Sequence, residues 1–128
     1  MRMKKSQFLF GLFFMMMLTF SLSSLFGQQR SRAEIAWDWI YNAKALVIDV
    51  RTPEEFNSGH LDMAINIPLD TIEKRITAIV PNKTASIVLY CRSGNRSGQA
   101  YNILKSLGYT RIHNGGGYTE LLQARPKK

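Results

Sequence analysis

The sequence predicts an α/β fold in which a central, mainly parallel β-sheet is flanked by helices on both faces. Short, continuous apolar runs rich in β-branched residues, such as 45–50 and 86–90, are typical of buried strands. Amphipathic segments with helical spacing, such as 69–80 and 97–107, alternate with these runs. Because strands that alternate with helices form parallel sheets covered on both sides, this order predicts the fold class. A chain of 128 residues holds no more than one ordinary domain.

Local signals mark where the elements begin and end. Ser31 and Glu34 form a capping box ahead of the first helix. Pro53 opens a short helix at its first turn, and Gly59 follows its end. In order, the expected elements are a helix after residue 31, a strand over 45–50, a helix over 53–58, a strand over 64–67, a helix over 69–80, a strand over 86–90, a helix over 97–107, a strand over 110–113, a turn at 115–117 and a helix over 118–123.

Residues 1–27 differ from the rest of the chain and are predicted to be a signal peptide. Three basic residues within the first five positions precede the uncharged segment 8–26, and smaller, more polar residues follow. The alternative is an uncleaved anchor, because 8–26 approaches the roughly 20 residues that span a bilayer. In both cases the domain over 28–128 is expected to be exported to the periplasm or another extracytoplasmic space. The membrane is then a partner only through an uncleaved leader.

The composition limits the kinds of site that the domain can hold. Cys91 is the single cysteine of the chain, which excludes an intramolecular disulfide and every multi-cysteine metal site. The basic residues behind the net charge of +8 are scattered and lack interleaved aromatic residues, so nucleic acid is not an expected partner. Because exported proteins usually pair their cysteines or lack them, a single unpaired cysteine in such a chain calls for a functional explanation.

The segment Cys91-Arg-Ser-Gly-Asn-Arg96 is the candidate site. It lies between a predicted buried strand and a predicted helix, where open α/β sheets present their binding crevice. Successive backbone N–H groups and the positive end of the helix dipole can stabilise a thiolate there, and Gly94 permits the backbone angles that such a loop needs. Arg92 and Arg96 add positive charge, so Cys91 is expected to be an acidic nucleophile and not an inert buried cysteine. The expected substrate-binding residues are Arg92, Ser93, Gly94, Asn95 and Arg96.

Three blocks of the chain, in order, resemble the single-domain rhodaneses, a family of sulfurtransferases. They are residues 49–56 with 59–68, the six-residue loop 91–96, and residues 107–109 with 114–117. The resemblance covers about residues 33–122. Four residues separate the loop cysteine from the loop arginine, whereas tyrosine-phosphatase loops have five. Two departures from the family pattern lie outside the loop: Met63 stands where glycine is usual, and no tryptophan follows the closing glycines.

This resemblance implies a rhodanese-like domain and a two-step sulfur transfer that needs no metal and no organic cofactor. Cys91 would take the outer sulfur of thiosulfate or a similar donor as a persulfide, and cyanide or a thiol would then remove it. Asp49, Arg51 and Ser97 are expected to support the loop, and Arg51 is predicted to pair with Glu55 four residues away. The alternatives are a sulfur-relay module with little turnover, and an enzyme of the phosphatase or arsenate-reductase type.

Overall fold

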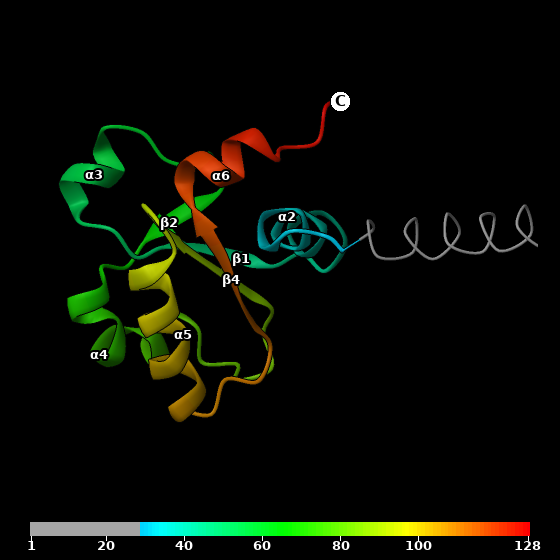
Figure 1. Cartoon of the computed structure of the whole chain (residues 1–128). Coiled ribbons are helices and arrows are strands. Elements are labelled where there is room, and N and C mark those ends of the chain that lie inside the picture. Colours follow the sequence, from blue (N-terminus) through cyan, green and yellow to red (C-terminus); the bar gives the residue numbers. More distant parts are fainter. Residues whose placement is uncertain (1–28) are drawn as a thin grey trace, which may run out of the picture. The chain divides into compact units, whose positions relative to one another are not determined.

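The structure is a computed structural model that describes residues 29–128, and its strands form one parallel sheet in the order β2-β1-β3-β4 (Figure 1). The strands are β1 (Leu46–Asp49), β2 (Ala64–Asn66), β3 (Ile87–Cys91) and β4 (Ile112–Gly117). The helices are α2 (Arg32–Asn42), α3 (Pro53–Asn57), α4 (Leu69–Ile79), α5 (Asn95–Ser106) and α6 (Tyr118–Gln123). The predicted α/β fold is confirmed. The predicted leader, residues 1–27, lies outside the described residues.

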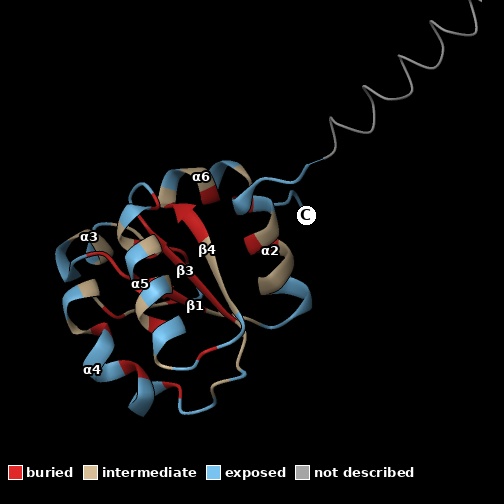
Figure 2. Ribbon diagram, turned by 60° about the horizontal axis from the view of Figure 1, so that its bottom comes forward, coloured by how far each residue is buried: buried red, intermediate tan, exposed pale blue. Residues whose placement is uncertain are grey.

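Helices cover both faces of the sheet. α4 and α5 pack on one face, and α2 and α6 pack on the other (Figure 1). Because successive side chains of a strand point to opposite faces, β3 supplies Leu89 and Cys91 to the first layer, and Val88 and Tyr90 to the second. Figure 2 shows β3 buried between the two layers. Cys91 therefore ends a central strand and faces the layer formed by α4 and α5.

Capping boxes begin the two helices that precede β1 and β2. At α2, the Ser31 hydroxyl accepts a hydrogen bond from the Glu34 N–H, and the Glu34 carboxylate accepts one from the Ser31 N–H. Thr52 and Glu55 make the same pair of bonds at α3, with Pro53 in its first turn. The capping box predicted at Ser31 is confirmed. The second box also fixes the backbone around Glu55, which contributes to the site below.

The closing glycines belong to a strand and not to the turn that the sequence predicts at 115–117. β4 continues to Gly117 and pairs with the end of β3, after an irregularity in register between Leu89 and Tyr90. A Cβ atom at Gly115 would lie 3.2 Å from the Ala36 Cβ, so this glycine allows α2 to approach the sheet. The glycine run thus serves close packing.

The start of α5 also differs from the sequence-based expectation. α5 begins at Asn95, two residues earlier than predicted, because Gly94 turns the chain into the helix with a left-handed φ of 94°. Met63, which replaces the usual glycine of the family pattern, is an exposed side chain, so it takes no part in the core. Within residues 29–128, no helix combines the length and apolar character needed to cross a membrane.

Candidate active site

Cys91 lies at the carboxyl end of β3, under the loop that leads into α5, and it is completely buried. The Gly94 N–H donates a hydrogen bond to the Cys91 Sγ over 3.0 Å. The Ser97 hydroxyl lies 3.4 Å from the same sulfur and 2.7 Å from the Asn114 Oδ1. The loop therefore presents hydrogen-bond donors to the thiol from its backbone and from the first turns of α5.

Burial and hydrogen bonding act on the thiol in opposite directions. Burial raises the pKa of Cys91, because a charged sulfur loses its hydration. The Ser97 hydroxyl and the backbone N–H groups of Ser97, Ser93 and Gly94 favour the thiolate, and together they outweigh burial. The pKa of the Cys91 thiol is thus below its ordinary value. A thiolate formed at lower pH is available as a nucleophile without a separate general base.

The loop carbonyls point away from the sulfur and are held by side chains from other elements. The Ser93 carbonyl accepts a hydrogen bond from the Arg32 Nη2 over 3.1 Å. The Gly94 carbonyl accepts one from the Asn114 Nδ2, also over 3.1 Å. Asn114 is further fixed because its Oδ1 accepts a hydrogen bond from the Gly116 N–H. Helix α2 and strand β4 together hold the outer side of the loop.

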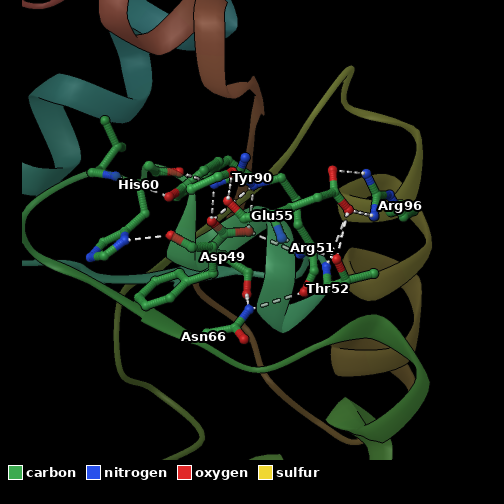
Figure 3. Close-up of polar contacts among 12 residues, drawn as sticks. Asp49, Arg51, Thr52, Glu55, His60, Asn66, Tyr90 and Arg96 are labelled. Atoms are coloured by element: carbon green, nitrogen blue, oxygen red, sulfur yellow. Dashed lines mark hydrogen bonds and ion pairs between the residues drawn. The ribbon is translucent and has the colours of Figure 1, made fainter.

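Arg96 forms a two-point ion pair with Glu55, which joins α5 to α3 (Figure 3). Its Nη1 lies 2.7 Å from the Glu55 Oε1, and its Nη2 lies 3.0 Å from the Oε2. The hydrogen bond from Arg96, together with those from Thr52, lowers the pKa of Glu55 to about 2, against the opposing effect of burial. The charge of Arg96 is thus balanced within the protein, and the pair anchors the start of α5.

The ion pair predicted between Arg51 and Glu55 is wrong. Arg51 instead bonds to both carboxylate oxygens of Asp49, at the end of β1, and both side chains are buried (Figure 3). Its Nη2 also donates to the Gly59 carbonyl over 2.7 Å, and its guanidinium lies over the rings of Tyr90 and Tyr118. Helical spacing failed here because Arg51 precedes α3, so it does not share a helix face with Glu55.

The remaining residues of the predicted site fall into two groups. Arg92, Ser93 and Asn95 are exposed on the outer side of the loop. Arg92 forms no ion pair with any other residue of the described chain. Gly94 and Ser97 are buried beside the sulfur. Within residues 29–128, no cluster of His, Cys, Asp and Glu side chains has the arrangement of a metal site.

Three residues that hold the loop were not among the site residues expected from the sequence. Arg32 and Glu120 form an ion pair that joins α2 to α6, although 88 positions separate them. Asn114 reaches the loop from β4. Local spacing does not show such contacts, because they depend on how distant segments pack. Asn114 falls within the closing block 114–117, which is the one signal in the sequence that points to it.

A hollow of about 580 Å³ lies beside the loop. Arg96 borders it from α5, Thr52 and Pro53 border it from the start of α3, and Pro68 and Leu69 border it from the start of α4. Its walls are largely apolar, and Glu54 and Asp70 are also among the lining residues. The hollow therefore opens next to the ion pair that anchors α5.

Known proteins resemble the chain both in sequence and in structure. The family model described as Rhodanese-like domain matches residues 32–124. Thiosulfate sulfurtransferase PspE of Escherichia coli (strain K12) is 42% identical over 80 residues, which cover 62% of this chain and 77% of that protein. Thiosulfate:glutathione sulfurtransferase of Saccharomyces cerevisiae is 31% identical over 81 residues, which cover 55% of this chain and 58% of that protein.

Two solved structures give the same result. The solved structure of a rhodanese with anions from E. coli has 43% sequence identity and a TM-score of 0.58, and the match covers 59% of this chain and 89% of that one. The human single-domain sulfurtransferase TSTD1 has 29% identity and a TM-score of 0.58, and the match covers 70% of this chain and 90% of that one.

Proposed function

Because the chain belongs to the rhodanese-like domain family and to the same enzyme class as its relatives, the thiosulfate sulfurtransferases, we propose that Cys91 carries sulfur as a persulfide between a small anionic donor and a nucleophilic acceptor. The observation that carries this proposal is the set of N–H and O–H donors around a buried thiol whose pKa is lowered. Such a cradle stabilises a compact negative sulfur, which is the charged species in both steps of the transfer.

In the first step, the Cys91 thiolate attacks the outer sulfur of thiosulfate. A sulfur–sulfur bond forms on the cysteine, the sulfur–sulfur bond of thiosulfate breaks, and its electron pair leaves with sulfite. The persulfide anion that remains is held by the donors that face Cys91, the Gly94 N–H first among them. This first step requires no metal and no organic cofactor.

In the second step, an acceptor thiolate or cyanide attacks the outer sulfur of the persulfide. Its bond to Cys91 breaks, the electron pair returns to the Cys91 sulfur, and a persulfidated thiol or thiocyanate leaves. A thiolate of lowered pKa is a good leaving group, so the donors that favour the first step also favour this one. The acceptor in the cell is proposed to be a thiol.

We propose that Arg92 attracts the anionic donor and that Arg96 positions the loop. Both arginines were expected to bind the substrate. Arg96 is paired with Glu55 through two hydrogen bonds, so most of its charge is already balanced. Arg92 is exposed and has no such carboxylate partner among residues 29–128, which leaves its charge available to a donor such as thiosulfate.

We also propose that the enzyme acts outside the cytoplasm. This part of the proposal rests on the order of charged, apolar and small residues in 1–27, which is typical of a signal peptide. The domain over 28–128 would then be the mature protein. Sequencing the N-terminus of the protein from the exported fraction distinguishes cleavage from an anchor over 8–26.

Intact-mass measurement after thiosulfate treatment tests the mechanism. We expect the wild-type protein to gain one sulfur atom, and cyanide to remove that atom with release of thiocyanate. The Cys91→Ser variant should gain nothing, because its hydroxyl does not form a persulfide. Equal labelling of the two proteins, or labelling of neither, would contradict the mechanism. Labelling by thiosulfate without turnover to cyanide or thiols would indicate a sulfur relay, and hydrolysis of an aryl phosphate without labelling would indicate a phosphatase.

A further inference from the structure

Arg32, the first residue of α2, lies across the outer side of the loop that carries Cys91. Its Nη2 donates a hydrogen bond to the Ser93 carbonyl over 3.1 Å. Its Nε and Nη2 also bond to the two carboxylate oxygens of Glu120 in α6. One side chain thus joins the loop to two helices that are distant from it in the sequence.

The backbone beneath Arg32 is shaped to receive its guanidinium group. A Cβ atom at Gly94 would lie 2.5 Å from the Arg32 Nη1, and one at Gly116 would lie 2.4 Å from the Nε. Both glycines have a left-handed φ, 94° and 93° respectively, which other residues rarely adopt. The guanidinium therefore lies directly against the backbone at two places where a side chain would displace it.

Both ends of this contact are fixed by the surrounding elements. The Glu120 Oε1 also accepts a hydrogen bond from the Gly117 N–H, where α6 begins. The carbonyl of Arg32 accepts one from the His113 Nε2 of β4, over 2.7 Å. An isolated surface ion pair contributes little to stability. The pair of Arg32 and Glu120, however, holds the Ser93 carbonyl of the candidate active site in a defined orientation.

The Ser93 carbonyl, which Arg32 holds, acts on the Cys91 sulfur through one peptide bond. The Ser93 carbonyl and the Gly94 N–H belong to the same planar, trans peptide, so they point in opposite directions. Arg32 bonds to the carbonyl, and the N–H lies 3.0 Å from the Cys91 Sγ. A hydrogen bond accepted by a carbonyl polarises its peptide and strengthens the donor on the other side.

We infer that Arg32 is a positioning residue of the sulfur site: by holding the Ser93 carbonyl, it aims and polarises the Gly94 N–H that stabilises negative charge on Cys91. The inference rests on the proposed function in one respect, since the persulfide is the charged sulfur that this bond would hold during turnover. Its effect on the free thiolate needs no turnover. In agreement with this arrangement, the pKa of Arg32 is raised chiefly by its hydrogen bond to Glu120 and in smaller part by charge attraction to Glu120 and Cys91.

The Arg32 variants leave the other charged residues around the loop unsubstituted, although Glu120 loses its ion-pair partner. They are Arg92 on the loop, the pair of Arg96 in α5 and Glu55 in α3, the pair of Asp49 and Arg51 after β1, and Glu120 in α6. A change in the ionisation of Cys91 in Arg32→Gln therefore reports the loss of the Arg32 side chain, both its charge and its contacts with the loop and Glu120, and Arg32→Lys separates the two because it keeps the charge.

The test is the pH dependence of Cys91 alkylation by iodoacetamide, which reacts with the thiolate. Removing Arg32 also changes access to the buried sulfur, so the rate near neutral pH is divided by the rate of the same protein at high pH. For Arg32→Gln we expect the ratio of the rate at about pH 6 to that at about pH 10 to fall roughly three- to tenfold below wild type. Arg32→Lys keeps the charge but lacks the planar fork that reaches Ser93 and Glu120 together, so its ratio should stay at least roughly twofold below wild type.

Two further variants complete the experiment. Arg75→Gln removes one exposed arginine from α4 and should leave the ratio unchanged. Glu120→Gln keeps Arg32 but weakens its anchor, so its ratio should fall by less than that of Arg32→Gln, and it carries the test if Arg32→Gln fails to fold. An unchanged ratio in both Arg32→Gln and Glu120→Gln would overturn the inference, and so would full recovery in Arg32→Lys, which would assign the effect to charge alone. If wild-type protein gains no sulfur from thiosulfate, the proposed function fails, while alkylation still decides the role of Arg32.

Discussion

The ion pair of Glu55 and Arg96 predicts a pH-dependent contribution to stability. The folded-state pKa of Glu55, about 2, is below its ordinary value of 4.5, so folding favours the charged form. The contribution is then fully present above about pH 4.5 and is lost as the pH falls towards 2. We expect Glu55→Gln to lower the free energy of unfolding at neutral pH by about 1–2 kcal/mol, allowing for the partial exposure of the pair. Urea unfolding measured at several pH values checks this expectation.

Glu54→Gln is the matched control for this variant, because Glu54 is the neighbouring residue of the same helix and is exposed. It should have little effect at any pH. The difference between wild type and Glu55→Gln should shrink as the pH falls below about 4.5. A difference that stays constant down to the lowest measurable pH, or an equal effect of Glu54→Gln, would show that the ion pair does not cause it.

Residues around Cys91 show which parts of the site could be predicted from the sequence. The loop could be predicted, because its cysteine, glycine and arginines are consecutive and lie between a strand and a helix. The partners of the charged residues around it could not. Glu55 pairs with Arg96, 41 positions away, and Arg51 pairs with Asp49 across a bend that follows β1. The first pair depends on how α3 and α5 are arranged in the fold, the second depends on the bend of the backbone, and the sequence offers no local pattern for either.

Among the elements, the helices were predicted more accurately than the last strand. The amphipathic pattern of α4 and the capping box of α2 are local signals, and both elements lie close to where these signals place them. β4 extends through Gly115, Gly116 and Gly117, which the sequence suggests as a turn. Glycine is typical of turns, but it also allows close approach of backbone and helix, and only the packing of α2 on β4 distinguishes the two uses.

Gly115→Ala tests this interpretation of the glycine run. The added Cβ would lie 3.1 Å from the Val88 Cγ1, 3.2 Å from the Ala36 Cβ and 3.3 Å from the Leu89 carbonyl oxygen. Because the sheet and α2 leave little room to adjust, we expect a loss of about 1–3 kcal/mol in the free energy of unfolding. Denaturant unfolding monitored by circular dichroism measures it.

Gly98→Ala provides the comparison, because the added Cβ would lie 3.5 Å from the nearest atom, the Asn114 Nδ2, which is an ordinary contact. Since alanine favours helices more than glycine, stability should be unchanged or higher by up to about 1 kcal/mol. If Gly115→Ala were as stable as Gly98→Ala, the close approach of α2 to β4 would not be the reason for this glycine.

At the scale of the whole domain that the structure describes, residues 29–128, two apolar layers share a single sheet. Buried residues of α4 and α5 pack on one face, and those of α2 and α6 pack on the other. β1 and β3 contribute alternate side chains to both layers, so neither layer can lose its packing without disturbing the strands that support the other. We therefore expect residues of both layers to unfold together.

Ile76→Ala tests this coupling from one side of the sheet. Ile76 of α4 is completely buried, and its truncation should cost about 2–5 kcal/mol. Both tryptophans of the protein, Trp37 and Trp39, belong to α2 on the opposite face, so their fluorescence reports the other layer. Fluorescence and far-UV circular dichroism should show the same lowered midpoint in denaturant. Glu73 is an exposed residue of the same helix, so Glu73→Ala should change the free energy of unfolding by less than about 0.5 kcal/mol. A fluorescence midpoint that stays at the wild-type value in Ile76→Ala would show that the layers unfold separately.

The complete burial of Cys91 sets a size limit on what can react with it. A disulfide requires the two sulfurs to approach to about 2.05 Å, with their Cβ atoms about 4 Å apart. Two copies of the chain cannot meet this requirement while each sulfur lies beneath its own loop, whereas a small anion or cyanide needs only a narrow opening. The fold thereby separates sulfur exchange with small molecules from covalent dimerisation through Cys91.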